Sequence, residues 1–295
     1  MGYDRLHRER SKTAENVCVN FESIKDYHVL VIGDAIEDRY RFCTALGKGS
    51  KESIVAAKFE REEVYKGGVW ATASHLTDLV KEVVIWHGER TTVNTKYLDG
   101  YNNKLFSVHE FKDAPASAEP IDLSVFDIVI VNDFGTQNFL TLQRRERIMR
   151  ESRYLAVNAQ SNSLNYGFNR VNEKWPYAHL CVCDELEARL AAHEPEAPIE
   201  EVILKLPYPS IIVTQGANGA TGYGCKEFYR ERAHTNRPVD LLGAGDAVLA
   251  IVAPFARAGF SIKELVHLGN AAGAAKVSIL GHRTHVTREQ LEANL

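Results

Sequence analysis

The sequence predicts an α/β fold in which a mainly parallel sheet is covered by helices on both faces. Short apolar runs rich in β-branched residues recur along the chain, and helical patterns separate several of them. Residues 247–258 are almost entirely apolar, which is typical of a buried helix, and residues 262–280 carry small residues at helical spacing. Two further segments alternate apolar and polar residues and predict a small separate β-sheet.

Composition and charge exclude several classes of protein. The chain of 295 residues is 45% hydrophobic and 25% charged, which is ordinary for a protein with a sizeable core. Its formal net charge of −4 provides no concentrated positive field, so we expect no nucleic-acid partner. No apolar run approaches the roughly 20 residues of a membrane-spanning helix, so we expect no membrane insertion. The five scattered cysteines and the lack of an apolar N-terminal run favour a reducing, cytoplasmic compartment.

The order of elements starts with a charged segment. Residues 1–27 are rich in Arg, Lys and Glu and predict a solvated N-terminal arm ahead of a domain at residues 28–292. The domain opens with the apolar run 28–32, which ends at Gly33-Asp34 as a buried parallel strand ends in a loop. Further strands are predicted at residues 83–86, 127–131, 154–157, 180–183 and 211–214.

The small sheet is predicted from residues 52–65 and 91–111, which alternate in polarity without helix caps. We place this lid at about residues 40–66 and 91–111. Its free edge needs covering, which gives a physical motive for a homodimer. Residues 112–120 and 192–198 have the Pro and small-residue composition of connectors.

The most informative stretch is V-D-L-L-G-A-G-D-A-V-L-A at residues 239–250. Gly243 and Gly245, on either side of Ala244, let the backbone bend closely around an anion. The following helix points its free N–H groups and positive dipole end at the same place. Asp246 would then lie beside a phosphoryl group, able to accept a proton from an attacking hydroxyl. The alternative is a plain helix start with Asp246 as a capping carboxylate.

This stretch closely resembles the D-x-x-G-A-G-D signature of the PfkB/ribokinase family of sugar and nucleoside kinases, and the likeness covers most of residues 28–292. The resemblance implies a ribokinase-like three-layer fold with a mainly parallel central sheet and a small β-sheet lid. It also implies ATP and Mg²⁺ as cofactors, and assigns catalysis to Asp246 and the Gly243-Ala244-Gly245 turn.

The resemblance assigns acceptor-binding residues. Residues 29–40 are similar to the family's first strand and G-D-x-x-x-D loop, which implies that Asp34 and Asp38 bind sugar hydroxyls. Gly67-Gly68 resembles the di-glycine beside the substrate, and Asn158 opens an amide-rich loop suited to hydroxyl recognition. Solvated turns and hydrogen-bonded loop scaffolding are the alternatives for these residues.

The resemblance also assigns the nucleotide and metal sites. Residues 211–220 are similar to the strand and turn bordering the nucleotide, which implicates Thr214, Gly216 and Gly219. Asn270 and Ala274 match the small-residue helix that walls the adenine. A structural turn and close helix packing are the alternatives for these two groups.

Asp184 and Glu187 fall where the family carries N-x-x-E, a motif tied to magnesium, with Asp in place of Asn. The alternative is an acidic first helical turn that complements the helix dipole.

The lid residues 91–111 are similar to those of heptose-phosphate kinases, the kinase half of bifunctional kinase-nucleotidyltransferases. This likeness implies a heptose-like sugar or sugar phosphate as the small-molecule substrate, pairing of two lids, and a functional link to a nucleotidyltransferase.

Three departures from the family pattern favour a second hypothesis. No Asn occurs between Gly68 and Val80, and the strand ending at Trp86 runs almost directly into Thr91. Leu241 and His282 replace a usual Thr and Asn. The leading prediction is therefore an ATP-dependent carbohydrate kinase; the alternative is a weakened or inactive kinase-fold module that binds nucleotide or sugar phosphate in a regulatory or docking role.

Overall fold

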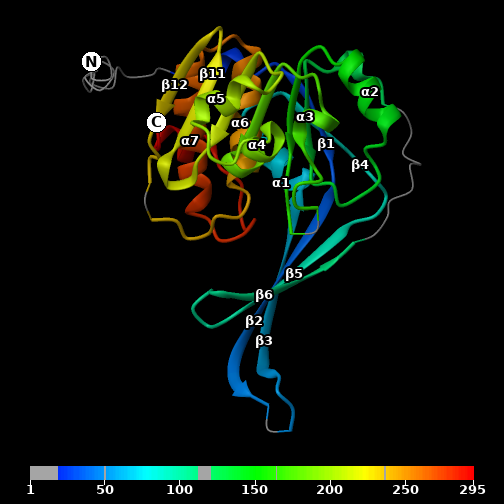
Figure 1. The fold of residues 1–295 in the computed structure, drawn as a ribbon, viewed down its shortest axis with the longest axis vertical. Coiled ribbons are helices and arrows are strands. Elements are labelled where there is room, and N and C mark those ends of the chain that lie inside the picture. Colours follow the sequence, from blue (N-terminus) through cyan, green and yellow to red (C-terminus); the bar gives the residue numbers. More distant parts are fainter. Residues whose placement is uncertain (1–18, 50, 112–120, 164, 236) are drawn as a thin grey trace.

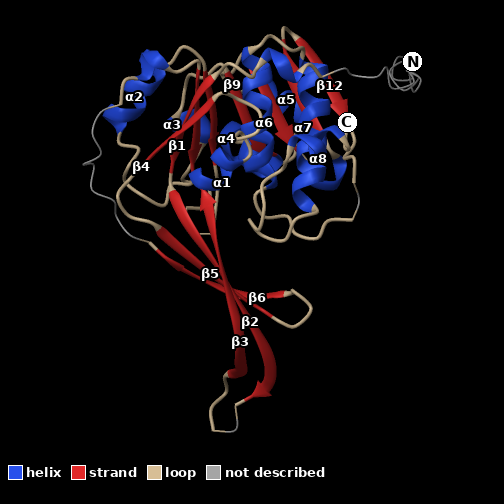
Figure 2. Ribbon diagram, turned by 180° about the vertical axis from the view of Figure 1, so that it is seen from behind, coloured by secondary structure: helices blue, strands red, loops and turns tan. Residues whose placement is uncertain are grey.

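The computed structural model describes residues 19–49, 51–111, 121–163, 165–235 and 237–295. They form an α/β body from which a β-sheet lid projects (Figures 1 and 2). The body contains an eight-stranded sheet, whose strands in spatial order are β12 (Glu227–Glu231), β11 (Ala220–Gly224), β10 (Ser210–Thr214), β9 (Leu180–Asp184), β8 (Leu155–Ala159), β7 (Ile128–Asp133), β1 (His28–Gly33) and β4 (Glu82–His87).

The central sheet is mainly parallel, as predicted. Strands β4, β1, β7, β8, β9 and β10 pair in parallel, and all six were predicted from the sequence. The antiparallel hairpin β11–β12 at one edge was not predicted. Its turn consists of Cys225 and Lys226, both with positive φ (51° and 67°), where Asn-Gly is the usual sequence signal.

Side chains alternate between the two faces of the sheet, and each face is buried by helices. On β1, Val29 and Val31 belong to one apolar core, whereas Leu30 and Ile32 belong to the other. One face is covered by α1 (Val69–Ser74), α6 (Ala244–Arg257), α7 (Ile262–Val277), α8 (Arg288–Glu292) and the 3-10 helix η1 (Phe21–Ser23). The other is covered by α2 (Leu142–Glu151), α3 (Val171–Lys174), α4 (Glu185–Ala192), α5 (Ile199–Leu204) and η2 (Leu123–Val125). These layers confirm the predicted three-layer architecture.

Helix α6 is buried on all sides, as its composition predicted. Every residue from Ala247 to Phe255 is buried. Gly269 of α7 lets the two helices approach closely, because a Cβ atom there would lie 3.2 Å from the Val248 side chain. The core therefore fixes the position of the α6 N-terminus.

The lid is a four-stranded sheet in the order β3 (Val55–Gly68), β2 (Ala35–Lys48), β5 (Thr92–Leu98) and β6 (Lys104–Glu110). Strand β2 begins earlier than predicted, since only Asp34 separates it from β1. Strand β5 likewise follows β4 after a short connection. The lid thus rises from the carboxyl ends of parallel strands, the edge where open α/β sheets bind ligands.

Part of the predicted N-terminal arm packs on the body. Phe21 and Ile24 are buried, and the Phe21 ring meets Phe255 edge-on with 5.5 Å between centroids. These two apolar residues were outweighed in the sequence by the charges around them. Residues 1–18 of the arm and the predicted connector 112–120 lie outside the described residues. Among the helices that are described, none combines the length and apolar character needed to cross a membrane.

Gly68 provides a test of the junction between lid and body. Its φ is 59°, and a Cβ atom would lie 2.2 Å from the backbone oxygen of Asp34. Because neither backbone can move aside cheaply, we expect Gly68→Ala to lower the free energy of unfolding by about 2 to 5 kcal/mol. Urea denaturation followed by tryptophan fluorescence measures this change.

The matched control for this prediction is Gly100→Ala, because a Cβ atom at Gly100 meets nothing within 4 Å. Its stability should stay within about 0.5 kcal/mol of wild type. Equal stability of the two variants would contradict a strained junction.

Candidate active site

The turn before α6 has the geometry of an anion site. Gly243 has a left-handed φ of 75°, and a Cβ atom there would lie 2.5 Å from the His282 ring. Among the described residues, the backbone N–H groups of Gly245 and Asp246 have no hydrogen-bond acceptor. A Cβ atom at Gly245 would meet no protein atom within 4 Å, so this position faces open space. The N-terminus of a 14-residue helix thus presents free amides to a cavity.

Asp240 holds the turn in place. Its carboxylate accepts hydrogen bonds from the backbone N–H of Leu242 (3.1 Å) and Gly281 (2.9 Å), from the Tyr40 hydroxyl (3.0 Å) and from Lys104 Nζ (2.8 Å). Burial opposes the charge, but the Lys104 ammonium and the two backbone N–H groups outweigh it and lower the pKa of Asp240 to about 2. Asp240 therefore stays ionised and ties the turn to lid strands β2 and β6.

A buried lysine lies beneath the same turn. Lys276 of α7 is fully buried, and its Nζ donates to the backbone oxygens of Leu242 (2.8 Å) and Gly281 (2.7 Å). Burial lowers the pKa of Lys276, whereas the nearby carboxylates Asp240 and Asp246 favour its charged form. The ammonium satisfies two carbonyls that would otherwise be buried without a donor.

Asp246 is a buried carboxyl group in the first turn of α6. Its Oδ1 accepts hydrogen bonds from Asn132 Nδ2 (2.8 Å) and Gln160 Nε2 (2.7 Å). Burial raises the pKa of Asp246 to about 6, although these two hydrogen bonds and the Lys276 charge favour the ionised form. Its partners lie on and beside neighbouring strands rather than on the helix, which argues against the capping alternative. A carboxyl group of this pKa is suited to act as a base near neutral pH.

A polar cavity of about 360 Å³ lies between the turn and the lid. Gly243, Ala244, Gly245 and Asp246 line it on the body side. The other polar side chains that line it are those of Asp38, Asn94, Lys96, His109, Thr136, Asn158, Gln160, Ser161, Asn162, Asp184, Glu187, Thr214 and His282.

A second cavity of about 490 Å³ lies on the other side of the turn, between the residues around the 3-10 helix η3 (Gly216–Asn218) and α7. The predicted residues Gly216, Gly219, Asn270 and Ala274 line it together. Five residues line both cavities: Asp184, Thr214, Leu241, Ala244 and Gly245. The two cavities therefore adjoin at the turn, as two substrates exchanging a group would require.

Asp38 lines the polar cavity, as expected of an acceptor-binding residue. It pairs with Lys96 of β5, and its Oδ2 is 3.6 Å from His282 Nε2. Burial lowers the pKa of His282 to about 4, so its ring is neutral at pH 7. A Cβ atom at Gly67 would lie 2.3 Å from Asp38 Oδ2, so this glycine makes room for the carboxylate and is more than a plain turn.

Asp34 is buried and is not among the residues that line the cavity. Its Oδ2 accepts hydrogen bonds from the backbone N–H (2.9 Å) and hydroxyl (3.1 Å) of Thr136. Its Oδ1 is buried without a partner among the described residues. Burial and the Asp133 charge raise the pKa of Asp34 to about 7. Contact between Asp34 and a sugar stays a prediction.

Asp184 and Glu187 form a capping box at the start of α4. Asp184 Oδ1 accepts from the Glu187 N–H (2.7 Å), and Glu187 Oε2 accepts from the Asp184 N–H (3.0 Å). Burial and the Asp184 charge raise the pKa of Glu187 to about 8. Asp184 is exposed where the two cavities meet, so it is the better placed of the two to face a hydrated metal ion.

Asn158 serves partly as scaffolding. Its Nδ2 donates to the backbone oxygen of Val182 (2.8 Å) and to Glu187 Oε2 (3.2 Å). Its Oδ1 is buried without a partner among the described residues. The alternative of a hydrogen-bonded loop thus accounts for the amide nitrogen but not for the oxygen.

Several residues of the site were not singled out from the sequence. Asn94 and Lys96 lie two apart on β5 and both line the cavity, a strand periodicity that could have revealed them. Lys276, a cation that follows a run of small residues near the end of α7, was a second missed signal. The Asn that the family usually carries after the di-glycine has no substitute at the cavity, because Ala71 and Ser74, which occupy the candidate positions, are not among the residues that line it.

Comparison with solved structures places the fold. Ribokinase from Thermotoga maritima matches with a TM-score of 0.71 and 18% identity, over 91% of this chain and 99% of that one. Arabidopsis thaliana ribokinase, solved with ribose and ATP, matches with a TM-score of 0.68 and 15% identity, over 91% of this chain and 98% of that one. A nucleoside kinase from Methanocaldococcus jannaschii has a TM-score of 0.68 and 15% identity, over 92% of this chain and 99% of that one. These likenesses show the ribokinase-like fold.

Comparison of sequences identifies the family. The bifunctional protein HldE of Hyphomonas neptunium (strain ATCC 15444) is 24% identical in an alignment 309 residues long that covers 90% of this chain. The match spans only 63% of the length of that relative. The model of the pfkB family of carbohydrate kinases matches residues 29–288. The chain therefore belongs to the pfkB carbohydrate kinase family.

Proposed function

We propose that the chain transfers the γ-phosphoryl group of ATP to a hydroxyl group of a sugar or sugar phosphate. One observation carries the proposal: two cavities of different character meet at a helix N-terminus with free amides, and Asp246 lines the polar one. Family membership supports the same reaction class.

The nucleotide would occupy the less polar cavity. Gly216 and Gly219 on one side and Asn270 and Ala274 on the other leave a space of about 490 Å³, within the usual range for a small-molecule site. A nucleotide whose base is held there would direct its phosphates towards Gly245, which borders both cavities. The free amides of Gly245 and Asp246 and the α6 dipole would stabilise negative charge on the transferring group.

Asp246 would act as the base. Both of its hydrogen bonds end on Oδ1, so Oδ2 is the oxygen that we assign to the acceptor hydroxyl. Asn132 and Gln160 would fix the orientation of the carboxylate during proton transfer.

The metal ion would be held on the body side. Mg²⁺ bound to the phosphates would neutralise part of their charge. We assign its water-mediated contact to Asp184, with Glu187 holding Asp184 in place through the capping box. The predicted role of Glu187 in magnesium binding is less favoured than that of Asp184, because Ser161, Asp184 and Asn158 already donate hydrogen bonds to the Glu187 oxygens.

The acceptor would lie beneath the lid. Asp38, Asn94 and Lys96 offer a carboxylate, an amide and an ammonium, a set that suits hydroxyl groups and an anionic substituent. The likeness of the lid to heptose-phosphate kinases favours a heptose-like acceptor. The match to part of a protein named bifunctional is compatible with a functional link to a nucleotidyltransferase, which stays a prediction, as does a cytoplasmic location.

The alternative of a weakened or inactive kinase-fold module keeps specific support. No side chain of α1 replaces the missing Asn at the cavity, and the Lys96 ammonium is already paired with Asp38. Such a module would bind nucleotide tightly without turnover.

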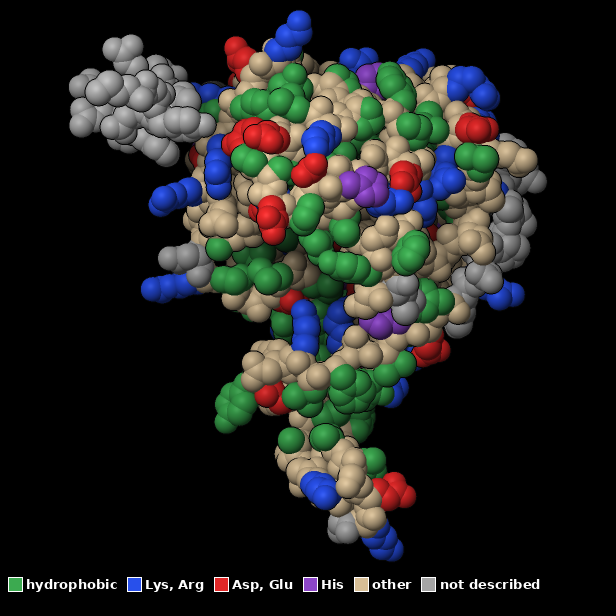
Figure 3. All heavy atoms as spheres, viewed as in Figure 1, with side chains coloured by type: hydrophobic (Ala, Val, Ile, Leu, Met, Phe, Trp, Pro, Cys, Tyr) green, Lys and Arg blue, Asp and Glu red, His purple; other side chains and the backbone are tan. Residues whose placement is uncertain are grey.

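We also propose that two copies of the chain pair through their lids. Strands β3 and β6 are the edges of the lid sheet and expose Val55, Phe59, Phe106 and Val108, and Figure 3 shows hydrophobic side chains gathered on the lid. Pairing would cover these apolar side chains and free edges.

Sedimentation equilibrium tests this pairing of lids. We expect a dimeric mass for the wild type and a shift towards monomer in Phe59→Asp. A monomeric wild type at micromolar concentration would contradict the pairing.

Asp246→Asn tests the function directly. The change keeps the shape of the side chain but removes the base, so kcat/KM should fall by about 10² to 10⁴-fold in a phosphotransfer assay across a sugar panel. Asp26→Asn, an exposed change at the opposite end of the sheet, should leave turnover unchanged. Tight nucleotide binding without any product in the wild type would favour the non-catalytic module.

The pH dependence of turnover and of stability, compared between the wild type and Asp246→Asn, gives an independent check. Because the base must be ionised, the acid limb of wild-type kcat/KM should lie near pH 6 rather than near the ordinary value of 3.8. Between these pH values the folded chain retains a proton that the unfolded chain has released, so Asp246 lowers stability as pH rises through this window. The loss is about 3 kcal/mol above pH 6, and Asp246→Asn should recover most of it at pH 7 but not at pH 3.5. An acid limb near pH 4 would contradict the burial of a catalytic carboxyl group.

Gly245→Ala tests phosphate binding at the turn without disturbing the fold. The added methyl group meets no protein atom within 4 Å but enters the space assigned to the phosphoryl group. We expect an unchanged or slightly higher unfolding midpoint, since Ala favours helices, and a fall in kcat/KM of about 100-fold or more. Gly100→Ala is again the control. Wild-type turnover in Gly245→Ala would contradict phosphate binding at this turn.

A further inference from the structure

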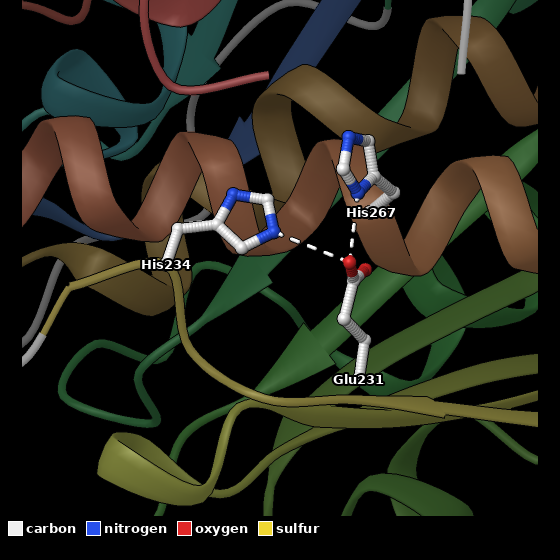
Figure 4. A group of neighbouring side chains, drawn as sticks. All are labelled: Glu231, His234 and His267. Atoms are coloured by element: carbon white, nitrogen blue, oxygen red, sulfur yellow. Dashed lines mark hydrogen bonds and ion pairs between the residues drawn. The ribbon is translucent and has the colours of Figure 1, made fainter. Parts of the chain in front are cut away.

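Three side chains outside the catalytic groups converge on one point (Figure 4). Glu231 ends β12, His234 lies in the segment that follows, and His267 is on α7. Glu231 Oε1 is 2.9 Å from His267 Nδ1 and 3.4 Å from His234 Nε2. One ligand atom from each residue lies within 4.8 Å of the other two, and no second group of this kind occurs in the part of the chain that the structure describes.

The hydrogen bonds behind the two rings fix which nitrogens carry a proton. His234 Nδ1 lies 2.7 Å from the backbone oxygen of Asn294, and His267 Nε2 lies 3.1 Å from that of Leu295. A backbone oxygen has no proton to donate, so these ring nitrogens must be the N–H donors. In neutral rings the other two nitrogens then direct lone pairs at Glu231, whose carboxylate can only accept.

This cluster therefore needs a cation among its lone pairs. A shared proton can meet that need, and so can a metal ion. Histidine ligands of metals commonly donate their second N–H to a backbone carbonyl or carboxylate, which is the pattern at both rings here. The second oxygen, Glu231 Oε2, is buried without a partner among the described residues and offers a further ligand atom.

We propose that Glu231, His234 and His267 form a binding site for a divalent transition metal of the zinc class. Two imidazole nitrogens and a carboxylate oxygen suit zinc, whereas Mg²⁺ and Ca²⁺ prefer oxygen ligands alone. Ligands about 2.0 to 2.2 Å from a tetrahedral ion lie about 3.3 Å apart. The 3.4 Å separation matches this spacing, and the 2.9 Å separation needs to open by only a few tenths of an ångström. A water molecule would complete the coordination.

The metal would stabilise one wall of the 490 Å³ cavity. His234 and its neighbours Ala233 and Thr235 line the 490 Å³ cavity, so the site joins that wall to β12 and α7. The ring contacts to Asn294 and Leu295 also tie the segment after α8 to the same point. Bound zinc should therefore stabilise the folded chain, because it binds the folded site preferentially.

Zinc binding to the full chain tests the proposal. After chelator treatment and dialysis, calorimetric titration with zinc chloride should show a site of one equivalent, and zinc should raise the unfolding midpoint. His267→Ala and Glu231→Gln should each raise the Kd for zinc by about 100-fold or more. The control His285→Ala removes a partly exposed histidine paired with Asp78, and its zinc Kd should equal that of wild type. Absence of zinc binding, or an unchanged Kd in His267→Ala, would overturn the site in favour of a shared proton.

A second measurement does not depend on the variants folding. Crystals of the wild-type chain grown with zinc should give an anomalous scattering peak among Glu231, His234 and His267 at the zinc absorption edge. No peak at that position would overturn the proposal. Both readouts are independent of phosphotransfer activity.

Discussion

The carboxylate of Asp240 is the constraint on which the rest of the site depends. It is buried and accepts four hydrogen bonds, two from lid side chains (Tyr40 and Lys104) and two from backbone N–H groups (Leu242 and Gly281). Lys276 binds the carbonyls of Leu242 and Gly281 from the other side. The shape of the turn at residues 243–245 and the position of the lid above it therefore depend on the hydrogen bonds around one buried carboxylate. A chain that lost Asp240 would leave the buried Tyr40 hydroxyl and the backbone N–H groups of Leu242 and Gly281 without their acceptor, which is costly in a low-dielectric interior.

The pKa values of Asp240 and Asp246, which lie on either side of the turn before α6, shift in opposite directions. Asp240 is buried, yet a lysine ammonium and backbone N–H groups lower its pKa to about 2. Asp246 is also buried, but among the described residues its hydrogen bonds come from two neutral amides, so burial prevails and its pKa rises to about 6. The first therefore suits a permanent structural anion, and the second suits a group that must gain and lose a proton. Two carboxyl groups six residues apart in the chain thus ionise differently because their surroundings differ.

Sequence patterns predicted those features that depend on local periodicity or on a short motif. The six parallel strands, the buried helix α6 and the glycine turn follow from β-branched runs, all-round apolar composition and G-A-G-D. The β11–β12 hairpin was missed because Cys225 and Lys226 adopt left-handed conformations that their side chains rarely favour. The sequence could not predict contacts between residues far apart in the chain. Examples are the hydrogen bonds of the buried Asp34 to Thr136 and the contact of Glu231 with His267. Lys276 was missed because a lysine in a helix is usually solvated, and only the packed structure shows two carbonyls around it.

We propose that the free amides at the start of α6 bind the terminal phosphoryl group of a nucleotide and place it beside Asp246. A crystal structure of the chain with a non-hydrolysable ATP analogue and Mg²⁺ would test this binding. We expect the base in the cavity lined by Asn270 and Ala274, and the γ-phosphate within hydrogen-bonding distance of the Gly245 and Asp246 N–H groups. A nucleotide bound elsewhere, or a γ-phosphate directed away from the polar cavity that Asp246 lines, would contradict it.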